Sequence, residues 1–306
     1  MSAIIDRVLR QLGDEHILDK LLSLPKSDLN SLLLELFQMQ AERLTPADLI
    51  KAYSLNRFSS PSDTNPVAYH TLEVDLLSAA QAIGIDTILL SPSAPFGSCS
   101  AFGCVDQKNV VSSVRGTETL SDPSNMLAVI IADKIKSQQA NNSEPLHYCT
   151  TARAVRAQKF SGEGFFSHFG LFCIVSSGKA RSSYTCEMEL LAKQLTYYKK
   201  LFLEKYNAKF SVSLRKRGGY TDTDGFFERM AEFIKCELKE IPISFDVDHT
   251  DNNYYKGINF KIYVERDGEI FEIGDGGFVD WVEKMTGNKK ERCLISGIGV
   301  DRLFLL

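Results

Sequence analysis

The sequence predicts an α+β fold, in which a mostly antiparallel sheet is flanked by helices and preceded by a helical region. Three observations predict it. Apolar residues recur at helical spacing through residues 1–58, segments rich in β-branched and aromatic residues gather after residue 146, and amphipathic stretches long enough for helices separate those segments. Strands that cluster late in a chain, with helices between them, are typical of the α+β class.

The N-terminal region is expected to be helical throughout. Its clearest apolar stripe is a third helix, which begins after a turn at residues 25–28 and carries its apolar side chains on one face. A fourth helix is expected to begin at Thr45, with Thr45 as the N-cap and Pro46 at the first helical position. We favour a helical packing region over an appended recognition or dimerisation module, because no residue pattern here indicates chemistry.

The breaker-rich run at residues 59–66 predicts a domain boundary, which divides the chain into residues 1–60 and 61–306. After it, residues 67–82 are expected to form an amphipathic helix that Gly84 ends, followed by a strand at residues 87–91. Asp122 is expected to cap a further helix.

Residues 146–178 predict a long β-hairpin, the element around which the rest of the chain is organised. Its strands are expected at Tyr148–Gln158 and Phe165–Val175, and the glycines between them permit the turn. Arg153 and Arg156 are three positions apart on the first strand, so they point to opposite faces and only one can face a given cleft. A plain amphipathic hairpin with surface arginines is the alternative interpretation.

The C-terminal half is expected to supply the remaining strands and two long helices. The helices are predicted at residues 187–205 and 225–239, and the strands at residues 209–214, 243–247, 258–266 and 270–273. The last two strands are expected to form a hairpin across Asp267–Gly268. The basic run at residues 214–220 is interpreted as a solvated loop.

Composition excludes several classes of protein. Of the 306 residues, 44% are hydrophobic and 24% are charged, which is typical of a globular protein with a large core. The net charge of -4 argues against general nucleic-acid binding. No apolar run reaches the roughly 18 residues of a membrane-spanning helix. The seven cysteines lack metal-site spacing, so we expect reduced thiols in a cytoplasmic protein.

The hairpin resembles motif 2 of the class II aminoacyl-tRNA synthetases, in particular the histidyl-tRNA synthetase branch, in which an arginine strand is followed by a returning strand with a phenylalanine. Three more segments resemble that family in its own order: Asn253–Phe260, Phe271–Asp280 and Cys293–Leu306, the last being similar to motif 3. The resemblance covers residues 66–306 and implies the class II catalytic core. The chain ends shortly after the motif 3 arginine, so no C-terminal anticodon-binding domain is expected.

The resemblance implies a nucleotide site. Arg156 would hold the α-phosphate of ATP, Phe169 would stack on the adenine, and Arg302 would contact the γ-phosphate side. Gln158 stands where the family has the motif 2 glutamate. Mg²⁺ is expected to accompany the phosphates. The helix and strand at residues 67–91 are similar to motif 1, the dimer-interface element of the family, so a homodimer is expected.

The histidine-specific part of the family's pocket is missing from this sequence. Leu171 and Val175 stand where the family has the glutamine and glutamate that grip the imidazole, and Thr250–Asp251 stand near its catalytic arginine. Asp122 is a weak replacement for the acid that binds the amino group, although a simple helix N-cap is the favoured interpretation. The other candidates for substrate contacts are Tyr254, Tyr255 and Gly276.

Three functions remain open at this point. The first is ATP-dependent activation of a carboxylic or amino acid other than histidine, which the retained arginines favour. The second is a non-catalytic regulatory subunit of ATP phosphoribosyltransferase, because histidyl-synthetase-like proteins without an anticodon-binding domain have that role. The third is a catalytically inactive binding scaffold. A protein partner is therefore possible, and no membrane partner is expected.

Overall fold

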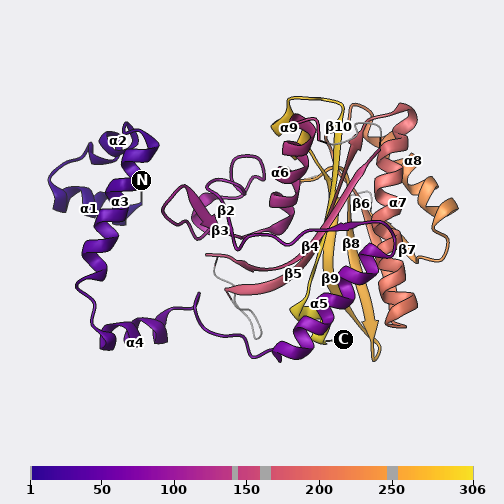
Figure 1. The fold of residues 1–306 in the computed structure, drawn as a ribbon. Coiled ribbons are helices and arrows are strands. Elements are labelled where there is room, and N and C mark those ends of the chain that lie inside the picture. The colour runs from indigo at the N-terminus through magenta and orange to yellow at the C-terminus, as the bar shows by residue number, and fades with distance from the viewer. Residues whose placement is uncertain (1, 140–143, 159–166, 247–253, 306) are drawn as a thin grey trace.

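The computed structural model describes residues 2–139, 144–158, 167–246 and 254–305, and Figure 1 shows their arrangement. The helices are α1 (Ala3–Leu12), α2 (Ile17–Leu22), α3 (Lys26–Ala41), α4 (Pro46–Leu55), α5 (Pro66–Gln81), α6 (Pro123–Lys136), α7 (Thr185–Lys199), α8 (Thr223–Glu237) and α9 (Trp281–Thr286). The strands are β1 (Asp86–Thr87), β2 (Ser93–Pro95), β3 (Thr117–Thr119), β4 (Leu146–Val155), β5 (His168–Lys179), β6 (Lys209–Lys216), β7 (Ile243–Asp246), β8 (Lys256–Arg266), β9 (Glu269–Val279) and β10 (Glu291–Gly299). Four further helical turns are η1 (Gln107–Asn109), η2 (Ser182–Tyr184), the π-helical η3 (Lys200–Lys205) and η4 (Asp301–Leu305).

Among the described residues, eight strands form one sheet in the order β1-β4-β5-β10-β9-β8-β6-β7. The two edge pairs, β1 with β4 and β7 with β6, are parallel, and every pair between them is antiparallel. Strands β2 and β3 form a separate antiparallel ribbon. The predicted α+β class is confirmed, with helices flanking a mostly antiparallel sheet.

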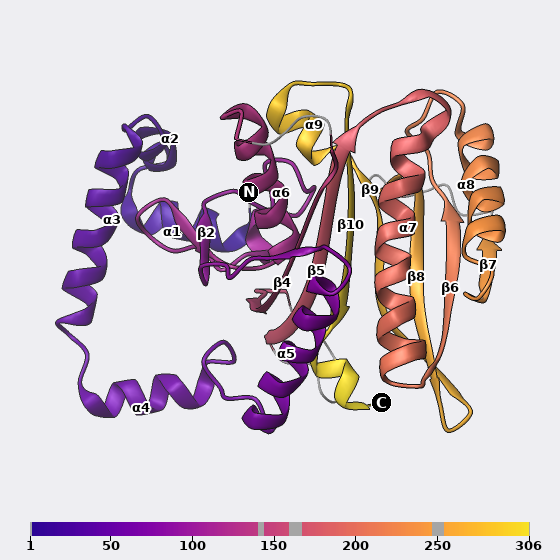
Figure 2. The same ribbon diagram turned by 45° about the vertical axis from the view of Figure 1, so that its right-hand side comes forward.

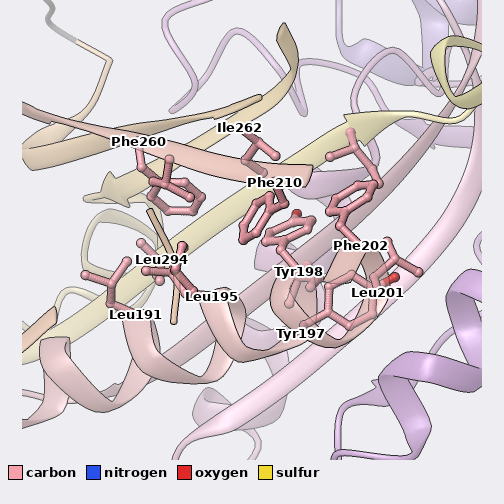
Figure 3. Packing of buried hydrophobic residues seen from close by; sticks show 14 of the residues in the cluster. Leu191, Leu195, Tyr197, Tyr198, Leu201, Phe202, Phe210, Phe260, Ile262 and Leu294 are labelled. Carbon is pink, nitrogen blue, oxygen red and sulfur yellow. The ribbon is translucent and has the colours of Figure 1, made fainter. Parts of the chain in front are cut away.

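The register of the central strands sorts their side chains between two faces. Phe172 of β5 and Leu294 of β10 face α5, α7 and α8, in the larger hydrophobic core. Val175 and Ile295 face the other way, toward α6 and α9. We call these the α7 face and the α6 face. Figure 3 shows the α7 face, where the ring of Tyr198 and other side chains of α7 and η3 pack against the sheet.

Helices α6 and α9 cover only part of the α6 face. Val175 and Ile295 lie beneath them and are buried. Leu171, Gly299 and Asp275 lie farther along the same face, and each is partly exposed. The α6 face therefore has an uncovered half, near the end of β4, the start of β5 and the end of β10.

The observed elements differ most clearly from the predicted ones at β1, β9 and α9. Strand β1 is much shorter than the predicted strand at residues 87–91, and Leu89 beyond it is almost fully exposed. Strand β9 is longer than predicted, because its glycines continue the strand. A Cβ on Gly276 would lie 2.5 Å from the Phe260 ring, so glycine is required there for close packing and not for a turn. Helix α9 was not predicted.

The N-terminal helices α1–α4 stand apart from the sheet in both ribbon views (Figures 1 and 2). The predicted N-cap of α4 is confirmed: Thr45 and Asp48 form a capping box, with Pro46 in the first turn. The structure also confirms the predicted cap of α6, where the Asp122 side chain accepts a hydrogen bond from the backbone N–H of Ser124. The tip of the predicted hairpin and residues Thr250–Asp251 lie outside the described residues.

Candidate functional site

Arg156 and Phe169 lie together on the uncovered half of the α6 face. Arg156 follows the last residue of β4, and its backbone N–H donates to the carbonyl oxygen of Ser167, so it stays in register with the start of β5. The centre of its guanidinium lies 5.1 Å from the centroid of the Phe169 ring. Both belong to the alternation that puts Leu171 on this face. The structure therefore brings the predicted phosphate arginine onto the predicted stacking residue.

The Arg156 guanidinium is held from the other side by the turn that begins α6. Its Nε donates to the carbonyl oxygen of Ser121 at 3.1 Å, and one Nη lies 3.7 Å from a carboxylate oxygen of Asp122. The second carboxylate oxygen of Asp122 accepts from the backbone N–H and the hydroxyl of Ser124, at 2.9 and 2.7 Å. Asp122 thus caps α6 with one oxygen and neutralises Arg156 with the other. About a third of the Arg156 side chain remains exposed.

Arg302 reaches the same face from η4. Gly299 at the end of β10 has no side chain, and a Cβ there would lie 3.2 Å from the Arg302 stem. The stem therefore crosses Gly299 on the α6 face, and the guanidinium donates to the carbonyl oxygen of Glu272 at 3.0 Å. Arg302 is exposed. The two predicted arginines thus share one face of the sheet, and each is held by a different partner.

Arg153 has a different environment, on the opposite face as predicted. Its guanidinium lies over the ring of Tyr69, bonds with His168 at 2.7 Å and lies 3.6 Å from Asp301. Asp301 also accepts from the backbone N–H of Gly170 at 2.6 Å. Arg153 therefore fixes η4 against β5, and η4 carries Arg302.

Three charged side chains on the uncovered half were not predicted from the sequence. They are those of Lys261, Glu272 and Asp275. Lys261 of β8 bonds with Glu272 at 2.6 Å and lies 3.7 Å from Asp275. Desolvation raises the pKa of Asp275, and the nearby carboxylates of Glu272 and Asp122 also raise it. The Lys261 ammonium and a hydrogen bond from Tyr255 act in the opposite direction. If the glycines of β9 had been assigned to a strand, the alternation of side chains along β8 and β9 would have placed Lys261 and Asp275 on one face.

The space beside Val175, where the family resemblance places the bound amino acid, is filled by side chains of the chain itself. Val175 is fully buried, and it packs in one cluster with Phe102 and Trp281, which are 8% and 1% exposed. The Trp281 ring meets those of Phe102 and Tyr254 edge-on, with centroids 5.5 Å apart in each pair. Tyr255 is buried in the same cluster. Val175 is therefore covered by these side chains, whereas Leu171 is partly exposed.

Two other predicted site residues lie off the uncovered half of the α6 face. Gly276 faces the α7 face, packed against Phe260 and Ser296, so it does not contact a ligand on the α6 face. Gln158 is exposed beyond β4, and its carbonyl oxygen accepts a hydrogen bond from Arg57. Phe278 of β9, the same strand as Gly276, is buried in the α7-face core.

A cavity of about 560 Å³ lies elsewhere, along the β1 edge of the sheet. Its lining includes Asp86, Lys134 and Tyr148, and the Lys134 ammonium donates to the Tyr148 hydroxyl at 2.8 Å. None of the predicted site residues lines it. The described residues contain no cluster of three or more His, Cys, Asp or Glu side chains arranged to hold a metal ion. They also contain no helix that is long and apolar enough to span a bilayer.

Comparison of the fold with solved structures points to one group of proteins. The apo histidyl-tRNA synthetase of S. aureus superimposes with a TM-score of 0.59 at 13% identity, over 80% of this chain and 67% of that chain. An ATP phosphoribosyltransferase regulatory subunit/histidyl-tRNA synthetase from Bacillus halodurans gives 0.60 at 14% identity, over 80% and 82%. A histidine–tRNA ligase subunit from Alicyclobacillus acidocaldarius gives 0.56 at 11% identity, over 81% and 96%.

These comparisons establish the fold: the chain shares the fold of histidyl-tRNA synthetase structures, as the sequence motifs predicted. No protein-family model and no curated protein matches the sequence itself. Identities of 11–14% show a shared architecture and leave activity to be argued from the site.

Proposed function

We propose that this chain binds ATP on the uncovered half of the α6 face. The observation that carries the proposal is the stacking of the Arg156 guanidinium over Phe169, with Arg302 on the same face. A guanidinium binds phosphate oxygens through paired N–H donors, and an aromatic ring offers a stacking surface to a purine. In this arrangement Arg156 binds the α-phosphate, Phe169 stacks on adenine, and Arg302 binds the far end of the triphosphate.

The ion pairs of the site set the conditions for binding. Asp122 neutralises Arg156, and Lys261 is shared between two carboxylates, so the site is close to neutral without a ligand. A triphosphate therefore needs additional cations. Mg²⁺ binds through phosphate oxygens and water, with few protein ligands. The site residues fit a magnesium ion brought in by the nucleotide, and the part of the chain that the structure describes holds no cluster of three or more His, Cys, Asp or Glu side chains for a separate metal ion.

Isothermal titration calorimetry with ATP and Mg²⁺ tests the proposal. Arg156→Ala is expected to weaken binding by about 10–100-fold, because charge-assisted hydrogen bonds contribute roughly 1.5–3 kcal/mol. Phe169→Leu is expected to weaken ATP binding and to leave binding of inorganic tripolyphosphate unchanged, because only adenine needs the ring. Arg181→Ala is the control, since Arg181 is a surface residue paired with Glu189. Wild-type protein that binds no ATP at millimolar concentration would overturn the proposal.

For the reaction, we propose activation of an acid other than histidine, in which a carboxylate oxygen attacks the α-phosphorus of the ATP held by Arg156. An acyl adenylate forms, the bond from the α-phosphorus to the bridging oxygen breaks, and pyrophosphate leaves. The acid would lie over Leu171, because Val175 is covered. Such catalysis depends mostly on positioning and charge stabilisation, which Arg156 could supply. A pyrophosphate-exchange assay across the amino acids tests it. Exchange with at least one acid supports this step, and no exchange with any acid, in protein that binds ATP, excludes amino-acid activation.

One observation favours a second candidate, a non-catalytic protein that associates with a partner. Phe102, Trp281 and Tyr254 fill the space beside Val175, where the family resemblance places the amino acid. The Bacillus halodurans neighbour is named in part as a regulatory subunit of ATP phosphoribosyltransferase. Co-purification of this chain with a transferase catalytic subunit, together with ATP binding and no pyrophosphate exchange, is the expected result for this candidate.

A further inference from the structure

Residues 57–60 follow the N-terminal helices and lie against the β4–β5 hairpin, and we call them the linker. The guanidinium of Arg57 donates to the carbonyl oxygens of Ala157 and Gln158, the second at 3.1 Å, and to the hydroxyl of Ser167 at 2.7 Å. The first two acceptors follow the end of β4, and the third precedes the start of β5. One side chain of the linker therefore bonds with both sides of the hairpin.

The linker makes a second contact through His168. The Nε2 atom of His168 lies 2.6 Å from the carbonyl oxygen of Ser60, and the Nδ1 atom lies 2.7 Å from a guanidinium nitrogen of Arg153. An arginine only donates and a carbonyl oxygen only accepts, so Nδ1 accepts from Arg153 and the Nε2–H donates to Ser60. The ring of His168 thus holds the start of β5 to the linker.

The residues that the linker holds are the sequence neighbours of Arg156 and Phe169. Residues 157–158 follow Arg156 directly, and residues 167–168 precede Phe169 directly. The backbone N–H of Arg156 donates to the carbonyl oxygen of Ser167 at 2.9 Å, which closes the same end of the hairpin. Contacts that fix these neighbours also keep the Arg156 guanidinium 5.1 Å from the centroid of the Phe169 ring.

The sheet gives this end of the hairpin little support. Strand β10 pairs with β5 only from Leu171 onward, so residues 167–170 lie beyond its end. Loop residues supply single bonds, since the carbonyl oxygen of Asn109 accepts from the backbone N–H of Ala157, and the Asp301 carboxylate accepts from the backbone of β5. A two-stranded hairpin without neighbouring strands is at best marginally stable in water. The end that carries the candidate site therefore depends on contacts from outside the sheet.

We propose that Arg57 is a positioning residue of the nucleotide site, which holds the two sides of the hairpin together so that Arg156 stays over Phe169. This inference rests on the proposed ATP binding at the same site. Arg57 precedes residues 66–306, so the family resemblance assigns it no role. Its acceptors are uncharged oxygens, and hydrogen bonds from a charged donor are stronger than those between neutral groups. Ser167 is only 6% exposed, so loss of the guanidinium would leave a buried hydroxyl without this partner.

Hydrogen exchange of the ligand-free chain, followed by NMR, tests the positioning. The backbone N–H of Arg156 is expected to exchange about 10-fold faster in Arg57→Ala than in the wild type, because this end of the hairpin opens more readily. Arg57→Lys keeps the charge and loses the planar fork of donors, so an intermediate rate is expected. Arg43→Ala is the control, since Arg43 is an exposed arginine between α3 and α4. Equal exchange in the wild type and Arg57→Ala would overturn the proposal.

Calorimetry with ATP and Mg²⁺ tests the effect on the site. Arg57→Ala is expected to weaken ATP binding by about 5–20-fold, and Arg57→Lys is expected to restore part of the affinity. In a Phe169→Leu background, Arg57→Ala is expected to weaken binding by about threefold or less, because Arg57 acts through the Arg156–Phe169 pair. Melting curves of the variants show whether each remains folded.

The outcomes of this titration separate the two proposals. A wild type that binds no ATP overturns the proposed function and, with it, the role of Arg57. A wild type that binds ATP, with equal affinity in Arg57→Ala, overturns the role of Arg57 alone. An equal effect of Arg57→Ala in the wild-type and Phe169→Leu backgrounds would also overturn it, because Arg57 would then act independently of the stacked pair.

Discussion

At the residue scale, Asp122 is the side chain whose role the sequence left most open. The family resemblance suggested a weak contact with an amino group, and the favoured interpretation was a helix cap. In the structure its two carboxylate oxygens do different things, one capping α6 and the other lying 3.7 Å from Arg156. A phosphate that binds Arg156 must therefore compete with this carboxylate.

Replacing Asp122 with asparagine is expected to strengthen ATP binding. Asparagine retains the capping oxygen and removes the negative charge that opposes the phosphate, so affinity is expected to rise about 3–10-fold, corresponding to roughly 1 kcal/mol for a partly exposed pair. Calorimetry with ATP and Mg²⁺ measures the change. Weaker ATP binding in Asp122→Asn would contradict the proposed competition and would assign Asp122 a direct role in holding the ligand.

At the element scale, β9 shows why spacing alone placed one candidate on the wrong face. Its glycine run resembled a ligand-binding segment, yet the run continues the strand and its positions alternate between the faces. Asp275 and Gly277 lie on the α6 face, and Gly276 lies on the α7 face. The resemblance suggested Gly276 as a substrate contact, and only the register shows which of these residues can meet a ligand on the α6 face.

Gly276→Ala is expected to destabilise the fold and to leave ligand affinity unchanged in the protein that remains folded. The new Cβ would lie 2.6 Å from the backbone carbonyl oxygen of Ile295, which cannot move as a side chain could. Overpacking of this kind costs about 1–3 kcal/mol. Gly218→Ala is the control, since nothing lies within 4 Å of its Cβ position. Urea unfolding compares the two variants, and equal stability would contradict the packing.

The β4–β5 hairpin predicts a pH dependence through His147. Burial, together with a smaller effect of the nearby Lys193 ammonium, lowers the pKa of His147 from its ordinary value of 6.5 to about 4. Between pH 6.5 and 4 the unfolded chain takes up a proton at this position that the folded chain does not. The free energy of unfolding is therefore expected to fall by on the order of 2 kcal/mol across that interval.

His147→Asn is expected to remove this part of the pH dependence. The asparagine amide can replace the imidazole nitrogen that bonds with the Ser176 hydroxyl at 2.9 Å, and it does not titrate. Urea unfolding at several pH values, for the wild type and the variant, measures the difference. The interpretation is wrong if the two proteins lose the same stability between pH 6.5 and 4.

At the scale of the whole molecule, local patterns predicted most of the elements and the class of fold. Helical stripes, caps and the hairpin are encoded in neighbouring residues, so α3–α8 and β4–β6 lie close to where they were expected. The four family-like segments also predicted the fold of the sheet region. The filling of the space beside Val175 could not be predicted, because Phe102, Val175 and Trp281 meet only through tertiary packing.

The linker joins the N-terminal helices to the candidate site at this scale. The proposed nucleotide binding depends on the uncovered half of the α6 face. Arg57 is the contact between the linker and that site, since it bonds with residues around the end of β4 and the start of β5. The proposal for ATP binding can hold even if the proposal for Arg57 fails.

The most direct measurement is a crystal structure of the full chain with Mg²⁺ and a non-hydrolysable ATP analogue. The account predicts adenine stacked on the Phe169 ring, phosphate oxygens bonded to the Arg156 guanidinium in place of Asp122, and Arg302 turned from the Glu272 carbonyl toward the triphosphate. A nucleotide seated instead in the cavity along β1, or density on the α6 face that leaves the Arg156–Asp122 pair intact, would contradict it.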